Sequence, residues 1–383
     1  ETGRALMIMT MAIARPAVSR SEFADWRRDP RQRCASTARR STKYARNSAA
    51  EVSSQTHQAQ SPISYETANH ETPSSEKLGL DTANPGKTKR GRFAPSPTGP
   101  LHFGSLVAAV ASYADARRDG GTWLVRIEDI DCNRSVPGAA DQILRTLDRF
   151  GLHWDGSVVY QSPRTKAYAE ALDRLRSQGL IFPCACSRRD IATHGRPGPE
   201  GPIYPGTCRD GMAKQRQQYS ERLRVGNVSI NIEDRIQGRI AQELAVEVGD
   251  FVVRRADGMY AYQLAVVVDD AASGINSIVR GADLLRSTPR QVYLQRLLNL
   301  PLPRYAHVPL VIDRDGRKLS KTLASAPVDT ANPLPALLHA WHFLGQSPLP
   351  EASDSVDGFW QQALPNWCIA KVPSARSLAL ELA

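Results

Sequence analysis

Long apolar runs are absent from this sequence of 383 residues. The longest one near its start, Ala5–Ala14, spans about ten residues, whereas a membrane-spanning helix needs roughly 20. We therefore expect no membrane partner. The basic Arg4 before this run and the small residues at 12–17 also occur in secretory signals, which is the less favoured interpretation.

Cysteine is scarce as well. Only six cysteines occur, which excludes a small domain held together by a disulfide framework. Three of them, Cys184, Cys186 and Cys208, lie close together in the sequence, and this spacing suits a metal site better than disulfides. The pattern indicates a reducing, cytoplasmic location.

A strong charge excess is missing from most of the chain. The formal net charge is +10, but residues 1–90 carry 15 basic and 9 acidic residues, and the remainder carries 34 and 30. This mild surplus is compatible with a transient RNA partner but does not establish one, because phosphate contacts need a local patch of Lys and Arg.

Residues 1–89 have little hydrophobic periodicity after Ala14. They are rich in Ser, Thr, Ala, Arg and Gln, and stretches such as 53–61 have too few apolar side chains to form a core. We expect a disordered extension. Its Arg-rich part, 15–46, is compatible with a passive tail, an RNA-binding arm, a targeting sequence, or residues translated upstream of the real start.

A strand–helix–strand pattern begins at residue 90. Arg90–Ala94 and Thr122–Glu128 have the composition of strands, and Phe103–Arg118 between them has that of a helix. This alternation predicts an α/β fold with a parallel, Rossmann-type sheet. We expect further helices at 139–150, 165–178 and 289–300, and further strands at 259–268, 277–280 and 307–312.

Two parts of the chain depart from this alternation. The stretch at about 184–251 lacks its rhythm and contains the cysteine cluster, so we interpret it as an insertion into a catalytic domain at 90–322. Residues 323–383 include helix-like stretches at 334–344 and 360–370, which predict a small helical C-terminal region.

A His-x-Gly element, His102 to Gly104, lies where the first expected strand leads into the first helix. A helix N-terminus presents free N–H groups and a partial positive charge, and glycine lets a nucleotide approach the backbone. His102 and Gly104 are therefore candidates for binding ATP. For His102 alone, a capping or core histidine is the simpler explanation.

A second basic element, 318–322, reads Lys-Leu-Ser-Lys-Thr. Lys318 and Lys321 suit a loop that closes over a triphosphate, and a solvated basic turn is the alternative. Together with the His-x-Gly element, this sequence resembles the paired signature motifs of class I aminoacyl-tRNA synthetases. Arg92–Gly99 resembles the glutamyl branch of that family.

The resemblance implies a pocket for L-glutamate. A dicarboxylic amino acid needs guanidinium groups for its carboxylates and an acceptor for its ammonium group, which Arg92, Arg280 and Glu128 can provide. Without the resemblance, an ion pair of Arg280 with Asp269 or Asp283 is slightly favoured. The family pattern adds Ala94, Ser96 and Tyr262 to the pocket.

The three clustered cysteines are one ligand short of a tetrahedral zinc site. His194 and Tyr204 both lie between them in the sequence and are candidates for the fourth ligand. The spacing of Tyr204 and Cys208 resembles the zinc site of the glutamyl-queuosine subfamily. By this resemblance, Cys184, Cys186, Tyr204 and Cys208 bind one structural Zn²⁺.

Only residues 323–383 follow the lysine element, which leaves no room for the helical domain that reads the anticodon in an ordinary glutamyl-tRNA synthetase. Residues 90–373 thus resemble the truncated glutamyl-queuosine tRNA(Asp) synthetases. This implies a monomeric ligase that uses ATP with Mg²⁺ to make glutamyl-adenylate without tRNA, and then glutamylates queuosine in the anticodon loop of tRNA(Asp). His102 and Lys321 would stabilise charge on the phosphates, and no residue is identifiable as a general base.

Three other activities share part of the pattern. A truncated glutamyl-tRNA synthetase that charges an acceptor end would have the same active-site residues and would differ only in its RNA product. A non-catalytic paralogue would not need His102 and both lysines. A nucleotidylyltransferase would share the His-x-Gly element, but it would need neither a glutamate pocket nor a zinc insertion.

Overall fold

The computed structural model describes residues 88–212, 214–313 and 326–380. The predicted N-terminal extension, apart from Thr88 and Lys89, lies outside the described residues, and so do Lys318 and Lys321. Among the helices that are described, none is long and apolar enough to cross a membrane.

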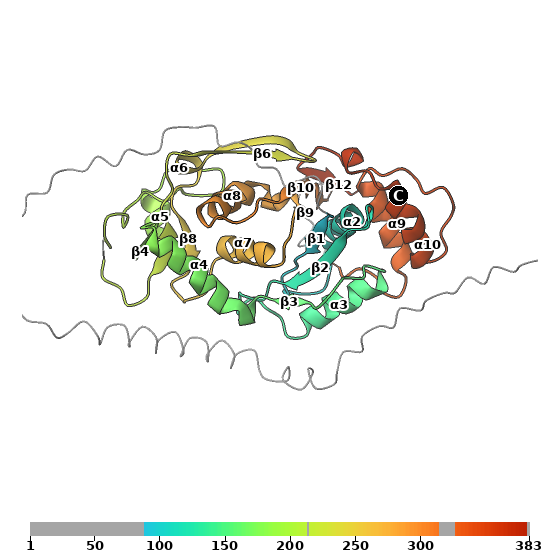
Figure 1. The fold of residues 1–383 in the computed structure, drawn as a ribbon, viewed down its shortest axis with the longest axis horizontal. Coiled ribbons are helices and arrows are strands. Elements are labelled where there is room, and N and C mark those ends of the chain that lie inside the picture. Colours follow the sequence, from blue (N-terminus) through green and yellow to red (C-terminus); the bar gives the residue numbers. More distant parts are fainter. Residues whose placement is uncertain (1–87, 213, 314–325, 381–383) are drawn as a thin grey trace, which may run out of the picture. The chain divides into compact units, whose positions relative to one another are not determined.

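Two sets of parallel strands lie at the centre of the fold (Figure 1). The strands are β1 (Arg90–Phe93), β2 (Thr122–Ile127), β3 (Val159–Tyr160), β9 (Ser277–Gly281) and β10 (Arg304–Val308). β2 pairs with β1 and β3, and β9 pairs with β10. The N–H of Asn276 donates to the carbonyl of Arg90 at 3.1 Å, which places β9 beside β1. The predicted parallel α/β fold is confirmed.

Helix α2 (Phe103–Arg117) connects β1 to β2 and is buried along most of its length. It packs between the strands and the C-terminal helices α9 (Pro333–Phe343) and α10 (Val356–Asn366) (Figure 1). Small residues permit the close approach, since a Cβ built at Gly91 would stand 3.1 Å from the Cβ of Ala116. A larger residue at position 91 would press α2 away from the sheet.

The remaining long helices are α3 (Ala139–Arg149), α4 (Thr165–Ser177), α7 (Tyr262–Ala272) and α8 (Thr288–Leu297). The helices predicted at 139–150, 165–178 and 289–300 are confirmed as α3, α4 and α8. The strand predicted at 259–268 is wrong, because most of this segment belongs to α7. Its valine-rich run is buried on almost all sides, and periodicity alone cannot distinguish such a helix from a buried strand.

The segment 307–312, predicted as one strand, contains the end of one strand and the whole of another. β10 ends at Val308, and β11 (Leu310–Ile312) pairs with the C-terminal β12 (Ser377–Ala379) instead of continuing beside β9. Pro309 separates the two strands. Because proline has no N–H to donate to a ladder, the chain leaves the central sheet at this point.

Mostly antiparallel strands lie between α4 and α7. β4 (Ile181–Cys184), β5 (Ser220–Leu223) and β8 (Phe251–Arg254) form one sheet, and β6 (Ser229–Asp234) and β7 (Gly238–Glu243) form a hairpin. Two short helices, α5 (Arg188–His194) and α6 (Leu244–Glu247), accompany them. Buried residues alternate with exposed ones along β6, so one face of the hairpin packs on the core.

The C-terminal region packs on α2 and α3 through its two helices. The predicted helix at 334–344 is confirmed as α9, whereas α10 begins and ends earlier than the stretch 360–370 suggested. The indole N–H of Trp360 donates to the carbonyl of Phe150 at 2.8 Å, which anchors α10 at the end of α3. Short 3₁₀ turns occur at η2 (Ser162–Arg164), η3 (Ala282–Ser287) and η5 (Ile369–Lys371).

Candidate functional site

Three predicted substrate residues lie at the carboxyl ends of parallel strands. Arg92 is near the end of β1, Glu128 directly follows β2, and Arg280 is near the end of β9. β1 has β2 on one side and β9 on the other, so it separates the two halves of the sheet. Open α/β sheets bind ligands in the crevice outside the strand ends at such a point.

The loop after β1 lies against the end of β2. The N–H of Glu128 donates to the carbonyl of Pro95 at 2.9 Å. This bond holds the predicted pocket residues Ala94 and Ser96, which flank Pro95, near Glu128. Ala94 is half-buried and Ser96 is exposed.

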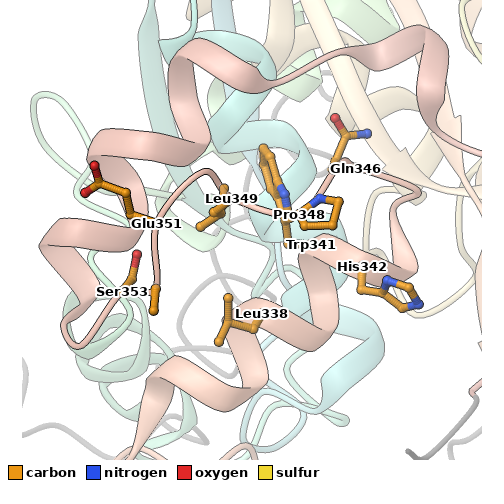
Figure 2. Close-up of a pocket in the computed structure, with 9 residues that line it drawn as sticks. Leu338, Trp341, His342, Gln346, Pro348, Leu349, Glu351 and Ser353 are labelled. Atoms are coloured by element: carbon orange, nitrogen blue, oxygen red, sulfur yellow. The ribbon is translucent and has the colours of Figure 1, made fainter.

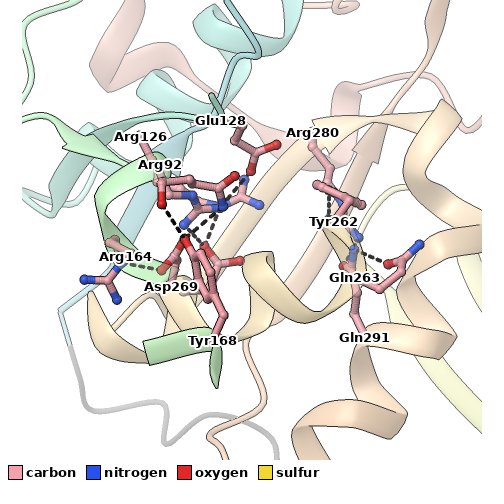
Figure 3. A network of polar contacts seen from close by, with 12 residues as sticks. Arg92, Arg126, Glu128, Arg164, Tyr168, Tyr262, Gln263, Asp269, Arg280 and Gln291 are labelled. Atoms are coloured by element: carbon pink, nitrogen blue, oxygen red, sulfur yellow. Dashed lines mark hydrogen bonds and ion pairs between the residues drawn. The ribbon is translucent and has the colours of Figure 1, made fainter. Parts of the chain in front are cut away.

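A buried carboxylate joins two arginines at these strand ends, Arg92 and Arg126, which are labelled in Figure 3. Asp270 on α7 accepts from Arg92 Nε at 3.1 Å and from Arg126 Nη1 at 2.6 Å through the same oxygen, Oδ1. Burial opposes ionisation of Asp270, but Arg126 and Arg92 outweigh it and lower the pKa of this carboxyl group. Asp270 is therefore a carboxylate that orients both guanidinium groups.

Glu128 and Arg92 present opposite charges to a ligand. Burial raises the pKa of Glu128 above its ordinary value, against the influence of Arg126 and Arg92. An ammonium group would favour its charged form. Among the described residues, Arg92 makes polar contact only through Nε, so its Nη1 and Nη2 fork can bind a carboxylate. The pair matches the two charges of an amino acid.

Arg280 is buried, with 5% of its surface exposed, and it forms no ion pair with any carboxylate in the described part of the chain. Its Nε donates to His307 Nε2 at 3.0 Å, and its Nη1 donates to Tyr262 Oη at 3.3 Å. Its Nη2 donates to Thr288 Oγ1 at 2.9 Å and to Gln291 Oε1 at 2.7 Å. Buried charges are normally paired, so this arrangement calls for an anion.

Tyr262, the first residue of α7, lies beside Arg280 in Figure 3, and its Oη accepts from Arg280 Nη1. Burial raises the pKa of its phenol, and the charges of Arg280, Glu128 and Arg92 act on it as well. Tyr262 therefore lies within electrostatic reach of Arg92, Glu128 and Arg280.

Asp269, the neighbour of Asp270, has a different set of partners. It accepts from Gln161 Nε2 at 2.8 Å, from Tyr168 Oη at 2.7 Å and from Arg164 Nε. The ion pair of Asp269 with Arg280 that the sequence left open does not form. Asp269 instead ties α7 to α4.

Sequence reasoning assigned no role to Arg126, Asp270, Gln291 or His307. Asp270 carried a usable signal, because an acidic pair at the end of a valine-rich run must find buried partners. The other three carried none, since their roles arise from elements that meet only in the folded chain.

His102 caps helix α2. Its Nδ1 accepts from the N–H of Ser105 at 3.3 Å, and its Nε2 lies 3.0 Å from Ser105 Oγ. The simple capping role considered from the sequence is therefore present. It also fixes the imidazole at the N-terminus of the helix, where the partial positive charge of the helix favours an anion.

The described residues on both sides of 314–325 lie beside this turn. The N–H of Val328 donates to the carbonyl of Leu101 at 3.0 Å, and a Cβ built at Gly104 would meet Val311 Cγ2 at 3.9 Å. The lysine element is thus flanked by chain that contacts the His-x-Gly element. Lys318 and Lys321 themselves lie outside the described residues.

The sulfur atoms of Cys184, Cys186 and Cys208 lie within 4.8 Å of one another. Tyr204 Oη accepts from the N–H of Cys208 at 2.7 Å and lies 3.4 Å from Cys184 Sγ. Burial raises the pKa of the Cys186 thiol to about 11, so a cation is needed to favour its thiolate. Three sulfurs and a phenol fit the donor set of a tetrahedral metal ion.

His194 is directed elsewhere. Its ring is exposed at the end of α5, and Nδ1 lies 2.9 Å from the carbonyl of Asp190 in the same helix. The group of potential metal ligands found in the described residues contains the three cysteines and no histidine. This geometry favours Tyr204 over His194 as the additional donor.

A pocket of about 370 Å³ lies in the C-terminal region, between α9 and the segment that leads to α10 (Figure 2). Leu338, Trp341 and Leu349 contribute apolar walls. None of the predicted site residues lines this pocket, so it does not belong to the strand-end site.

Comparison with known proteins assigns the chain to a family. The family described as tRNA synthetases class I (E and Q), catalytic domain, matches residues 89–332. The chain is 56% identical over 289 residues to the glutamyl-Q tRNA(Asp) synthetase of Dechloromonas aromatica, which covers 74% of this chain and 95% of that protein. It is 54% identical over 284 residues to the same-named protein of Aromatoleum aromaticum, covering 74% and 90%.

Solved structures share the fold. Glutamate-tRNA synthetase from Elizabethkingia anophelis superposes with a TM-score of 0.65 at 23% identity, over 77% of this chain and 68% of that one. A glutamate tRNA ligase from Elizabethkingia meningosepticum in complex with its amino acid gives 0.63 at 23% identity, over 77% and 67%. The chain therefore belongs to the class I tRNA synthetases of the E and Q type and, within them, to the glutamyl-Q tRNA(Asp) synthetase family.

Proposed function

We propose that this chain activates L-glutamate with ATP to glutamyl-adenylate without tRNA, and then transfers the glutamyl group to the queuosine base in the anticodon loop of tRNA(Asp). The identity of 56% and 54% to proteins named glutamyl-Q tRNA(Asp) synthetase supports the reaction. The observation that carries it is the buried Arg280, whose described partners are all neutral. We further expect a cytoplasmic monomer.

In this proposal the strand-end residues bind L-glutamate. Arg92 and Arg280 bind carboxylate oxygens, and Glu128 accepts from the ammonium group. Tyr262 lies between these charges and contributes its hydroxyl, while Ala94 and Ser96 line the loop side of the pocket. Burial strengthens the contacts of Arg92 and Arg280, because competing water is excluded from charged groups at low exposure.

Activation joins the glutamate α-carboxylate to the α-phosphate of ATP, and pyrophosphate leaves with Mg²⁺. The imidazole of His102 at the N-terminus of α2 supports charge stabilisation on the phosphates, and Gly104 leaves room for the nucleotide. Lys318 and Lys321 complete the ATP site in this proposal. A hydroxyl of the queuosine cyclopentenediol then attacks the mixed anhydride and releases AMP.

We also propose that Cys184, Cys186, Tyr204 and Cys208 hold one structural Zn²⁺. The convergence of the three sulfurs and the phenol supports this ligand set. The ion would hold together the irregular loop that contains Tyr204 and Cys208 and the end of β4.

The test has two stages. Purified protein is first assayed for exchange of radiolabelled pyrophosphate into ATP with L-glutamate and without tRNA. It is then incubated with radiolabelled glutamate and either queuosine-containing or queuosine-free tRNA(Asp). The proposal expects exchange in the first stage, and labelling of only the queuosine-containing RNA in the second.

Labelling of queuosine-free tRNA(Glu) at its acceptor end would instead identify a truncated glutamyl-tRNA synthetase. Absence of pyrophosphate exchange with glutamate would contradict the proposed activation step itself.

A further inference from the structure

His307 lies between Arg280 and a second buried acid, Asp234. His307 on β10 and Arg280 on β9 are register partners in the parallel ladder, so their side chains lie side by side. Asp234 ends β6, and its Oδ2 lies 2.6 Å from His307 Nδ1. The side chains of both Asp234 and His307 are fully buried.

The hydrogen bonds define the tautomer of this imidazole. Arg280 Nε can only donate, so His307 Nε2 must accept from it at 3.0 Å. The ring proton is therefore on Nδ1 and is donated to Asp234. Burial lowers the pKa of His307 to about 4, which keeps the ring neutral at neutral pH.

This arrangement orients Arg280 without neutralising it. A carboxylate in direct contact would satisfy the guanidinium charge and weaken its attraction for a ligand. The neutral imidazole of His307 supplies the acceptor for Arg280 Nε, and the carboxylate of Asp234 contacts His307 rather than Arg280. The guanidinium plane is then fixed by His307 on one side and by Gln291 and Thr288 on the other.

We propose that Asp234 and His307 are positioning residues that fix the guanidinium plane of Arg280 so that it selects L-glutamate over L-glutamine. This inference rests on the proposed function, in which Arg280 binds a glutamate carboxylate. The described partners of Arg280 take four of its five N–H donors, so one Nη1 N–H can donate to a ligand oxygen, and the guanidinium charge favours a charged carboxylate over a neutral carboxamide. Such discrimination requires that the guanidinium cannot turn away.

Asp234→Asn is the sharpest variant. Asp234 Oδ1 accepts from the N–H groups of Ile236, Gln237 and His307, at 3.0, 2.9 and 3.1 Å, and an asparagine oxygen can keep these bonds. The new NH₂ group cannot accept from His307 Nδ1. The imidazole then moves its proton to Nε2, which places a donor against the Nε donor of Arg280.

Four further variants separate positioning from folding. His307→Leu removes the acceptor for Arg280, whereas the side-chain oxygen of His307→Gln restores one. The double variant Asp234→Asn/His307→Leu shows whether Asp234 acts through the imidazole. Tyr305→Phe is the matched control, because Tyr305 lies on the same strand as His307 and the change keeps its ring while removing a buried hydrogen bond to Gln295 on α8.

The readout is pyrophosphate exchange with varied glutamate, glutamine and ATP. Asp234→Asn and His307→Leu should each raise KM for glutamate roughly 10- to 100-fold and lower the preference for glutamate over glutamine. KM for ATP should change by less than about twofold, and Asp234→Asn should add no further loss in the His307→Leu background. His307→Gln and Tyr305→Phe should stay close to wild type.

Parallel increases in KM for ATP, or a full effect of Asp234→Asn in the His307→Leu background, would overturn the inference. So would an unchanged glutamate preference in Asp234→Asn. If His307→Leu does not fold, the effect of Asp234→Asn on KM for glutamate is compared in the wild-type and His307→Gln backgrounds. Glutamine has no ring tautomer that Asp234 could set, so Asp234→Asn should have little effect in the His307→Gln background. Failure of the wild-type protein to exchange pyrophosphate with glutamate would contradict the proposed function rather than the role of His307.

Discussion

Arg126 donates from Nη2 to Glu128 Oε1 at 3.1 Å, across the end of strand β2. Residues two apart in a strand point to the same face, which brings the two side chains together. Arg126 also pairs with Asp270, so its charge is shared between two carboxylates. Burial still raises the pKa of Glu128, and a ligand cation is the partner that would favour its ionised form.

Glu128→Gln should separate binding from stability. Glutamine keeps an acceptor for Arg126 but presents no charge to an ammonium group, so KM for glutamate should rise by roughly 10- to 100-fold, equivalent to about 1.4–2.8 kcal/mol. A raised folded-state pKa means that the contribution of Glu128 to stability is present at low pH and lost as pH rises through that pKa. Thermal unfolding at neutral pH should therefore not occur at a lower temperature.

The exposed Glu233→Gln on β6 is the matched control for this variant. It should leave both KM for glutamate and the unfolding temperature unchanged. A lowered unfolding temperature in Glu128→Gln, with equal increases in KM for glutamate and ATP, would show that Glu128 acts as a structural residue.

Asp269 should matter for stability rather than for substrate binding. Asp269→Ala leaves Gln161, Arg164 and Tyr168 without their shared acceptor, and loss of a buried ionic partner destabilises by about 3–5 kcal/mol. Tyr168→Phe removes only the hydroxyl, which lies 2.7 Å from Asp269 Oδ2 and 3.4 Å from the carbonyl of Gln161, and should cost about 1 kcal/mol. Urea unfolding measures both values.

Asp173→Ala, on the exposed face of α4, is the control for these two variants, since exposed ion pairs contribute roughly 0–1 kcal/mol. Equal losses for Asp173→Ala and Asp269→Ala would refute the role of Asp269 as the buried link between α4 and α7.

The sequence predicted the first strand–helix–strand unit well because each of its elements has a clear local signal. Arg90–Phe93 is a short strand followed by a Gly/Pro loop, and α2 begins at the capping residue His102. The error at α7 has a physical cause. Tertiary packing buries this valine-rich helix from several sides. Its sequence therefore lacks the alternation of apolar and polar residues that distinguishes a helix from a strand.

The candidate site was predictable where the residues resemble a family pattern, as for Arg92, Glu128, Tyr262 and Arg280. The supporting contacts were not predictable. Asp234 and Arg280 are connected only through His307, and these residues come from β6, β9 and β10. Such contacts depend on how distant strands are arranged, which local composition does not specify.

The cysteine cluster predicts one zinc ion per chain. Cys208→Ser should lower the zinc content measured by metal analysis, because serine is a much weaker ligand than a thiolate. Tyr204→Phe should weaken retention during dialysis against a chelator, since it removes the phenol 3.4 Å from Cys184 Sγ. His194→Ala is the control and should retain zinc as well as the wild type does. Zinc loss in His194→Ala with full retention in Tyr204→Phe would show that His194, and not Tyr204, is the fourth zinc ligand.

The buried imidazole of His307 should make the protein less stable on the acid side of neutrality. Its pKa is about 4 in the folded chain, because burial opposes its charge, against about 6.5 for an unperturbed histidine. A lowered folded-state pKa contributes stability that is present above the unfolded value and is lost as pH falls through the folded value. Between pH 6.5 and 4 this amounts to about 3 kcal/mol.

Urea unfolding at several pH values between 7 and 4 measures this loss. In His307→Gln the slope of unfolding free energy against pH should flatten in this window, because glutamine does not titrate. The exposed His194→Gln should keep the wild-type slope. Asp115 and Asp270, which do not contact His307, have pKa values below their ordinary range, so their acid-induced losses occur at lower pH and remain in both variants. Parallel wild-type and His307→Gln curves would show that His307 has the same pKa in the folded and unfolded chain. That result would contradict a neutral His307 that accepts from Arg280 Nε.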